Sequence, residues 1–399
     1  VCVGLPPVLC LLGSALRAAG GGAWADMDDV YAVGPASCVF DAVDRFAVAV
    51  LELGLDMRRS KLSAFSPAHD LERCPRCTAA RVPVGYLRRE GGFWIVDAPD
   101  EVVVDASGTR LPVRRRVRGL LVGGVPIGED EYVRQWAEWK GEDVVAFIRA
   151  TSTFLRGHRE HLWSVLRLSC APRFDYWLQH LAPRFTTGPA IAIDGELLRT
   201  AAACGRPGMF SEDDGTAAEG IAARRLRLPV RRRGLGLRRR AWLAPIAFCA
   251  SFVEAAARFS GAMCLGRIFA PGSFAAGGGR LGLWLAAASP AARDFERAWL
   301  GLQQRLHGGA DGGPLAASPA QAGVGVARRL QHALTAQLEQ DEYVQLQTDV
   351  EQLPTDAPAR LAFARAGRMG GAAFAAWPTP DYALAAEGAD GFEDCFAHS

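Results

Sequence analysis

Lysine is almost missing from this chain, which carries only Lys61 and Lys140 among 45 basic residues. Positive charge therefore rests on arginine, and with 43 acidic residues the net charge is only +2. Such a balance gives no global reason to expect a nucleic-acid partner, so any basic surface has to come from local clusters. Biased codon usage would also produce this preference for arginine beside abundant alanine and glycine.

Segments typical of membrane targeting are also lacking. The apolar stretch 1–25 ends in small residues like a secretory signal, but it lacks the basic region that leads such signals. The nearly apolar stretch 241–257 is short for a membrane span and is interrupted by Pro245 and Glu254. We therefore expect no membrane partner and a buried helix at 241–257. No internal repeat is evident.

The ten cysteines form neither a disulfide framework nor a complete zinc site. They are scattered and lack a secretory context, so we expect reduced thiols inside a cell. Cys74 and Cys77 form a CxxC with His69 upstream, but zinc needs four ligands and no second CxxC follows. His158 and His161 would complete a site only through folding, and their spacing also fits one face of a helix. The sequence therefore argues against zinc at Cys74/Cys77.

What the sequence does contain is a pair of adjacent carboxylates, Asp28 and Asp29, between two short apolar segments. Residues 23–25 and 30–33 have the apolar, β-branched and aromatic bias that suits a half-buried sheet. We expect a hairpin that presents both acids at its tip, where they can face a cleft. A turn without any catalytic role is the alternative, because Asp is a favoured turn residue.

An ordered series of elements follows the acidic pair. Apolar residues at helical spacing predict a helix with Ser37 as its cap and Gly54 at its end. A Gly-Leu turn and a predicted strand that carries Lys61 come next. Residues 118–128, with the sequence Arg-Gly-Leu-Leu-Val-Gly-Gly-Val-Pro-Ile-Gly, predict a second hairpin, whose glycines permit a tight turn and close backbone approach.

Taken in order, these elements resemble the end of the palm of reverse transcriptases, especially those of non-LTR-type retroelements. In that family an aromatic residue, any residue and Asp-Asp precede a helix, a Gly-Leu pair and a lysine. The hairpin at 118–128 is similar to the family's primer grip. Residues 228–237, Leu-Pro-Val-Arg-Arg-Arg-Gly-Leu-Gly-Leu, resemble a segment beyond the thumb, so that the resemblance covers about residues 5–250.

The resemblance implies RNA-templated synthesis of DNA from a DNA primer and deoxynucleoside triphosphates. Nucleotidyl transfer depends on positioning and charge stabilisation, and two Mg²⁺ ions, or Mn²⁺ in their place, would be held by carboxylates. By resemblance, Asp28 is the principal metal ligand and Asp29 assists it. Lys61 would lie near the triphosphate and protonate the leaving group, with a solvated strand lysine as the alternative.

The chain departs from the family pattern in two respects. The family carries another metal-binding aspartate on an earlier palm strand, whereas only a short lead precedes Asp28 here. We therefore expect the chain to begin within the palm, without the fingers or that aspartate. Asp26 stands where the family has an aromatic residue, and an extra carboxylate adds like-charge repulsion unless a cation neutralises it. The alternative function is a catalytically inactive remnant that binds nucleic acid.

Clustered arginines are candidate phosphate-binding sites, because guanidinium groups bind phosphate in a bidentate manner and their affinity falls with salt. One cluster precedes the predicted grip hairpin, and a denser one spans 224–240. A solvated face is the alternative for both. Together with the glycines of the grip-like hairpin, the candidate nucleic-acid-binding residues are Gly123, Gly124, Arg114, Arg115, Arg116, Arg231, Arg232 and Arg233.

These elements predict an α+β fold in two or three domains. A partial polymerase palm, an antiparallel sheet with helices, would span 1–130 with a β-rich insert at 71–117. A helical thumb-like region with the arginine-rich tract would follow at 131–240, and a helical Ala/Gly-rich region at 241–399. Within the insert we expect strands at 93–96 and 102–104. In the last region we expect helices at 241–258, 287–307 and 318–345.

Overall fold

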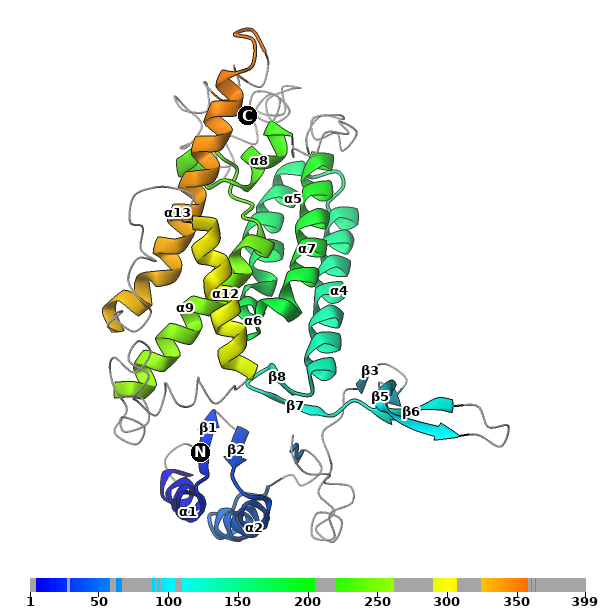
Figure 1. Ribbon diagram of the computed structural model, residues 1–399, viewed down its shortest axis with the longest axis vertical. Coiled ribbons are helices and arrows are strands. Elements are labelled where there is room, and N and C mark those ends of the chain that lie inside the picture. The colour runs from blue at the N-terminus through cyan, green and yellow to red at the C-terminus, as the bar shows by residue number, and fades with distance from the viewer. Residues whose placement is uncertain are drawn as a thin grey trace. The chain divides into compact units, whose positions relative to one another are not determined.

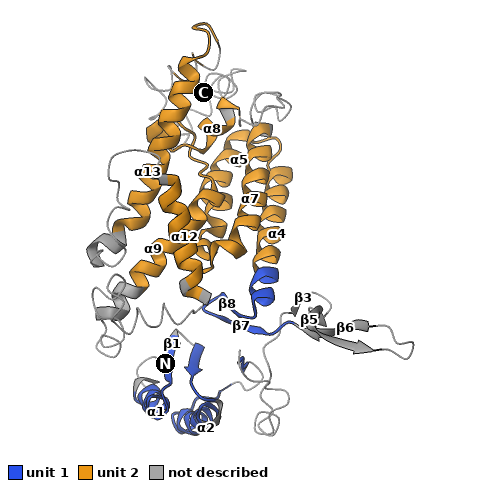
Figure 2. Ribbon diagram, in the orientation of Figure 1, with its two compact units in different colours: residues 1–136 blue, residues 137–399 orange. Residues whose placement is uncertain are grey.

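The computed structural model describes residues 5–26, 29–57, 62–66, 88–89, 92–93, 95–104, 110–204, 220–261, 290–306, 324–357, 360 and 363. The fold is α+β, as predicted, with helices predominating over short antiparallel strand pairs (Figure 1). The chain divides into two compact units, residues 1–136 and 137–399 (Figure 2). Each unit has its own arrangement of elements and is described separately below.

Unit 1 begins with two helices that pack against each other, α1 (Leu5–Ala18) and α2 (Ala36–Glu52). Both helices place a residue at every fourth position into their shared core, because side chains four apart lie on one helix face. These residues are Val8, Leu12 and Leu16 from α1 and Ala42, Phe46 and Val50 from α2. The helical pattern predicted for α2 is therefore confirmed.

The ends of α2 differ in how well the sequence predicted them. Gly54 adopts a positive φ of 76°, and the N–H groups of Gly54 and Leu55 donate to the carbonyls of Leu51 and Val50. This pair of bonds is a Schellman ending, so the stop predicted at Gly54 is confirmed. The predicted Ser37 cap is wrong. The helix begins at Ala36 with Pro35 as its cap residue, because the Pro35 carbonyl already accepts the first helical bonds.

An antiparallel hairpin lies against these helices and is formed by β1 (Gly22–Asp26) and β2 (Asp29–Val33). Ala23 and Ala32 are opposite each other in the register and pack against the helical core. Because strand side chains alternate between faces, the residues on either side of them lie on the other face of the hairpin. The predicted hairpin is present, but the prediction that both acids lie at its tip is wrong for Asp29, because Asp29 pairs with Asp26 as the first residue of β2.

The region predicted as a β-rich insert contains β3 (Arg88–Arg89), β4 (Gly92–Phe93), β5 (Ile95–Val104) and β6 (Arg110–Arg116). β3 pairs with β4, and β5 pairs with β6, whose register shifts between Asp97 and Val102. The single strand predicted over 93–96 is therefore wrong, because Phe93 pairs within β4 and a new strand begins at Ile95. The segment predicted at 102–104 is the end of β5.

A second hairpin, β7 (Gly119–Val122) and β8 (Val125–Gly128), leads into α4 (Asp130–Phe154), whose residues up to Trp136 still belong to unit 1. Gly123 and Gly124 both have positive φ, 55° and 76°, as a two-residue type I′ turn requires. At the open end of the hairpin, the Tyr132 ring packs against Gly119 and Gly128. A Cβ atom on Gly119 would lie 2.4 Å from that ring, so glycine is needed there. The predicted tight glycine hairpin is confirmed.

Unit 2 is helical around one large core. After α4 come α5 (Arg159–Val165), a π-helical turn η2 (Leu166–Cys170), a 3₁₀ turn η3 (Ala171–Phe174), α6 (Asp175–His180) and α7 (Pro183–Cys204). Ile148, Leu166, Phe174 and Ile193 are buried in its core. A Cβ on Gly141 of α4 would lie 2.6 Å from Cβ of Pro189 in α7, so the missing side chain lets these helices approach closely.

The remaining elements of unit 2 are α8 (Ile221–Arg227), a 3₁₀ turn η4 (Val230–Arg232), α9 (Arg240–Gly261), α12 (Pro290–Leu306) and α13 (Val324–Glu351). Helices were predicted in the regions of α9, α12 and α13, and all three are present. Among the helices that the structure describes, none combines the length and the apolar character of a membrane span.

A buried carboxylate joins two of these helices. Asp194 lies within α7 and accepts the N–H of Arg240 at 2.8 Å and that of Ala241 at 3.0 Å. These are the first residues of α9, so Asp194 caps a helix that is distant in sequence. The buried Arg240 guanidinium lies 3.4 Å from the Asp175 carboxylate of α6. One polar network therefore connects α6, α7 and α9.

Candidate functional site

The acidic hairpin is described up to Asp26 at the end of β1 and from Asp29 at the start of β2. Asp26 and Asp29 are directly opposite each other as the last paired residues of β1 and β2. Asp28 itself lies outside the described residues. The Asp29 side chain is exposed.

An aromatic pair continues the face on which Asp29 lies. Trp24 and Tyr31 are opposite each other in the register, and their rings stack with centroids 5.4 Å apart and planes 25° apart. Tyr31 is two residues after Asp29 on the same strand, so both side chains lie on one face. Its hydroxyl donates to Oδ2 of Asp29 at 3.3 Å. This face is opposite the one that packs on α1 and α2.

The glycine turn of the second hairpin contacts this acidic face. The backbone N–H of Gly123 donates to the Tyr31 hydroxyl at 2.9 Å, across 92 residues of sequence. Gly123, Tyr31 and Asp29 thus form a continuous chain of two hydrogen bonds. Two segments that the sequence analysis identified separately, the acidic hairpin and the grip-like hairpin, therefore meet within unit 1. Tyr31 was not among the residues predicted for the site, although its position two residues after Asp29 was a usable signal.

Other predicted site residues are placed less completely. Lys61 lies outside the described residues, as do Cys74 and Cys77. Arg114, Arg115 and Arg116 belong to β6, where their backbones pair with Asp97, Val96 and Ile95 of β5. His158 and His161 have ring centroids 5.8 Å apart in an edge-to-face arrangement. Across the described part of the chain, no three His, Cys, Asp or Glu side chains group closely enough to hold a metal ion.

The dense arginine tract packs against α13, which supplies carboxylates to it. Arg231 and Arg238 lie 2.6 Å and 2.8 Å from the two carboxylate oxygens of Glu339. Arg224 lies 2.9 Å from Glu342 and also pairs with Asp349. Guanidinium groups that the sequence offered as phosphate ligands are thus already paired within the fold.

Two further arginines of the tract contact aromatic rings. The Arg232 guanidinium lies 5.7 Å from the Tyr343 ring centroid, and that of Arg233 lies 5.2 Å from the Phe363 ring centroid. Arg233 also has a positive φ of 60°, as the turn between Pro229 and Gly234 requires. Phosphate binding by Arg231, Arg232 and Arg233 stays a prediction. A phosphate would have to compete with the Glu339 carboxylate and the aromatic rings for these guanidinium groups.

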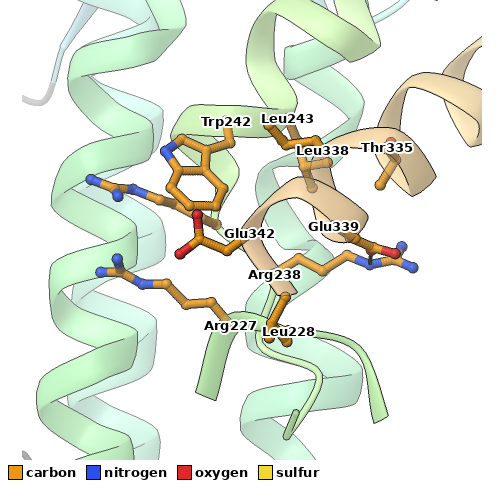
Figure 3. A pocket seen from close by; sticks show the side chains of 10 residues that line it. Arg227, Leu228, Arg238, Trp242, Leu243, Thr335, Leu338, Glu339 and Glu342 are labelled. Atoms are coloured by element: carbon orange, nitrogen blue, oxygen red, sulfur yellow. Dashed lines mark ion pairs between the residues drawn. The ribbon is translucent and has the colours of Figure 1, made fainter. Parts of the chain in front are cut away.

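A small pocket lies between this tract and α13 (Figure 3). Charged groups of both signs line it, including Arg227, Arg238 and the acids Glu339 and Glu342. Its aromatic wall is Trp242, whose ring has the Arg239 guanidinium at 4.9 Å and that of Arg305 at 4.7 Å. Because both acids and bases line it, the pocket favours no ligand of one charge.

Searches for related proteins return nothing: this chain matches no family model, no curated protein and no solved structure. The functional assignment therefore depends on the residues and their arrangement.

Proposed function

We propose that this chain is part of a reverse transcriptase and that the parent protein copies RNA into DNA by two-metal nucleotidyl transfer. The observation that carries the proposal is the hydrogen bond from the Gly123 turn to Tyr31 of the acidic hairpin. It brings together the two segments that resemble the catalytic hairpin and the primer grip. Support also comes from the layering, in which the two helices cover one face of the acidic hairpin and leave the other accessible.

Magnesium prefers hard oxygen ligands, and the described part of the hairpin supplies one exposed carboxylate for it. Asp29 offers exposed oxygen ligands, and Asp28, the preceding residue in the chain, would offer more. Bound there, a pair of such ions would activate the primer hydroxyl and stabilise the pyrophosphate. The protein's own part is to hold the carboxylates in place, and the Tyr31 hydroxyl restrains Asp29 directly. Lys61 would hold a proton for the departing pyrophosphate.

A second function is favoured by one specific observation. Asp26 is opposite Asp29 in the register, at the place where the family has an aromatic residue. Two acids facing each other at the hairpin end repel unless a cation lies between them. A remnant that binds nucleic acid without joining nucleotides would tolerate this arrangement. Divalent-cation binding at the hairpin therefore separates the two functions.

Metal-directed cleavage tests the proposed site on the chain itself. Fe²⁺ replaces Mg²⁺ at oxygen-ligand sites, and with ascorbate and peroxide it generates radicals that cut the nearby backbone. We expect cleavage confined to residues 24–33, suppressed by excess Mg²⁺ and abolished by the double substitution of Asp28→Asn and Asp29→Asn. Asp41→Asn, an exposed acid on α2, is the matched control and should leave the cleavage unchanged.

Primer extension tests the reaction. The longest form of the protein that its reading frame encodes is incubated with an RNA template, a DNA primer, Mg²⁺ and deoxynucleoside triphosphates. We expect extension that Asp28→Ala abolishes and that Lys61→Ala slows. Extension that persists in Asp28→Ala would refute the role assigned to Asp28. Absence of both metal-directed cleavage and extension would favour the inactive remnant.

A further inference from the structure

Tyr31 lies at a junction that neither hairpin forms alone. Its hydroxyl accepts one hydrogen bond from Gly123 and donates one to Asp29, at 2.9 Å and 3.3 Å. A phenolic hydroxyl has one donor and can also accept, so this geometry uses both of its capacities at once. Gly123 follows the last paired residue of β7, which places its N–H beyond the strand ladder.

The surrounding structure fixes the position of this hydroxyl. Stacking on Trp24 restricts the Tyr31 ring, and the strand register holds both residues opposite each other. Gly123 is fixed in turn by the type I′ conformation, which requires a positive φ. The Arg118–Glu129 ion pair, at 3.0 Å, closes the other end of the same hairpin. The Tyr31 hydroxyl is therefore held in place, so a change in one of its two hydrogen bonds affects the other.

We propose that Tyr31 is a positioning residue that couples the charge state of the acidic hairpin to the Gly123 turn. The proposal rests on the proposed function, since it requires a divalent cation at Asp29. Hydrogen bonds in a chain polarise one another, so a charged Asp29 makes the Tyr31 hydroxyl a better acceptor for the Gly123 N–H. A cation on Asp29 withdraws that charge and weakens the bond to Gly123. Metal loading is thereby communicated to the segment that resembles the primer grip.

Nuclear magnetic resonance on the full chain tests this coupling with Mg²⁺ as the probe. With ¹⁵N-labelled glycine and valine, the amide signals of Gly123 and Val30 are followed during a Mg²⁺ titration at constant ionic strength. In the wild type we expect both signals to shift along the same binding curve. In Tyr31→Phe, which keeps the ring and its stacking, Val30 should still shift while Gly123 no longer responds.

Hydrogen exchange supplies a second measurement. Loss of one hydrogen bond should speed exchange of the Gly123 amide in Tyr31→Phe roughly two- to tenfold. Tyr132→Phe removes a hydroxyl from the residue that packs on the other end of the same hairpin and is the matched control. We expect wild-type exchange and a wild-type Mg²⁺ response at Gly123 in that variant.

Each result decides a separate point. A Mg²⁺-induced shift at Val30 without one at Gly123 in the wild type would overturn the coupling and leave the proposed function intact. An equal Gly123 shift in Tyr31→Phe would overturn it as well. If Mg²⁺ affects neither signal, the metal site and the proposed function fail together with the coupling.

Discussion

Replacing Asp194 should destabilise unit 2 more than replacing any exposed acid. Its carboxylate is buried and accepts the first two N–H groups of α9, Arg240 and Ala241. Helix N-termini leave such donors without partners inside the helix, and a buried donor that loses its acceptor costs about 1–3 kcal/mol. Two donors lose their acceptor in Asp194→Ala, so we expect a loss of about 3 kcal/mol in the free energy of unfolding.

Two comparison variants make this prediction sharp. Asp194→Asn keeps one carbonyl acceptor for the helix end, so its loss should be about half as large, roughly 1–2 kcal/mol. Asp143→Ala removes an exposed partner of Lys140 on α4, where an ion pair contributes at most about 1 kcal/mol. The expected order of destabilisation is Asp194→Ala, then Asp194→Asn, then Asp143→Ala.

Denaturant unfolding measures these differences. Trp177 on α6 and Trp242 on α9 lie in the helices that the network joins, so tryptophan fluorescence reports their unfolding. Circular dichroism at the same denaturant concentrations follows the helices independently. If Asp194→Ala shifts the transition no further than Asp143→Ala, the interpretation of Asp194 as a remote helix cap is wrong.

The same carboxylate should make stability depend on pH. Burial raises the pKa of Asp194 above its ordinary value of 3.8, and burial also raises that of Asp175. In the window above that ordinary value the folded state therefore binds more protons than the unfolded state. The free energy of unfolding should fall as pH rises from 3.8 through the folded pKa. As pH rises across this window, the wild type should lose stability relative to Asp194→Asn, which cannot ionise. A difference in the free energy of unfolding that stays constant with pH would contradict the raised pKa of Asp194.

Two further predictions concern the arginine tract. Gly234→Ala would place a Cβ 2.1 Å from the Leu228 carbonyl oxygen, and because backbone cannot yield easily we expect a loss of about 2–3 kcal/mol. Gly301→Ala has open space on α12 and should be neutral or stabilising by up to about 1 kcal/mol, which makes it the control in thermal unfolding. Replacing residues 231–233 with glutamine should weaken binding to single-stranded RNA and reduce its logarithmic salt slope by up to about 2. Unchanged affinity and slope in a salt titration would reject phosphate binding by these arginines, and Arg297→Gln on α12 is the exposed control.

Local sequence determined the elements that surround the candidate site. The β-branched and aromatic residues around Asp28 predicted the hairpin, and Gly54 predicted the end of α2, because strand pairing and a Schellman ending depend on neighbours in the chain. The same holds for the type I′ turn at Gly123 and Gly124. The start of α2 was misassigned to a Ser37 cap because a proline can supply the starting geometry as well.

Only the tertiary structure decided how these elements meet. The Gly123 to Tyr31 bond spans 92 residues, and the bond from Arg231 to Glu339 spans 108. No local pattern marks such partners, because any exposed tyrosine or glutamate has the same propensities wherever the chain folds back. The sequence of the arginine tract predicts phosphate binding, but in the fold α13 supplies carboxylates that pair with it. Likewise, the sequence marks Asp194 only as an acid within a helix, and the fold places the first residues of α9 beside it. Sequence thus determined where turns and helices form, whereas the fold determined which charges are already neutralised and which remain exposed.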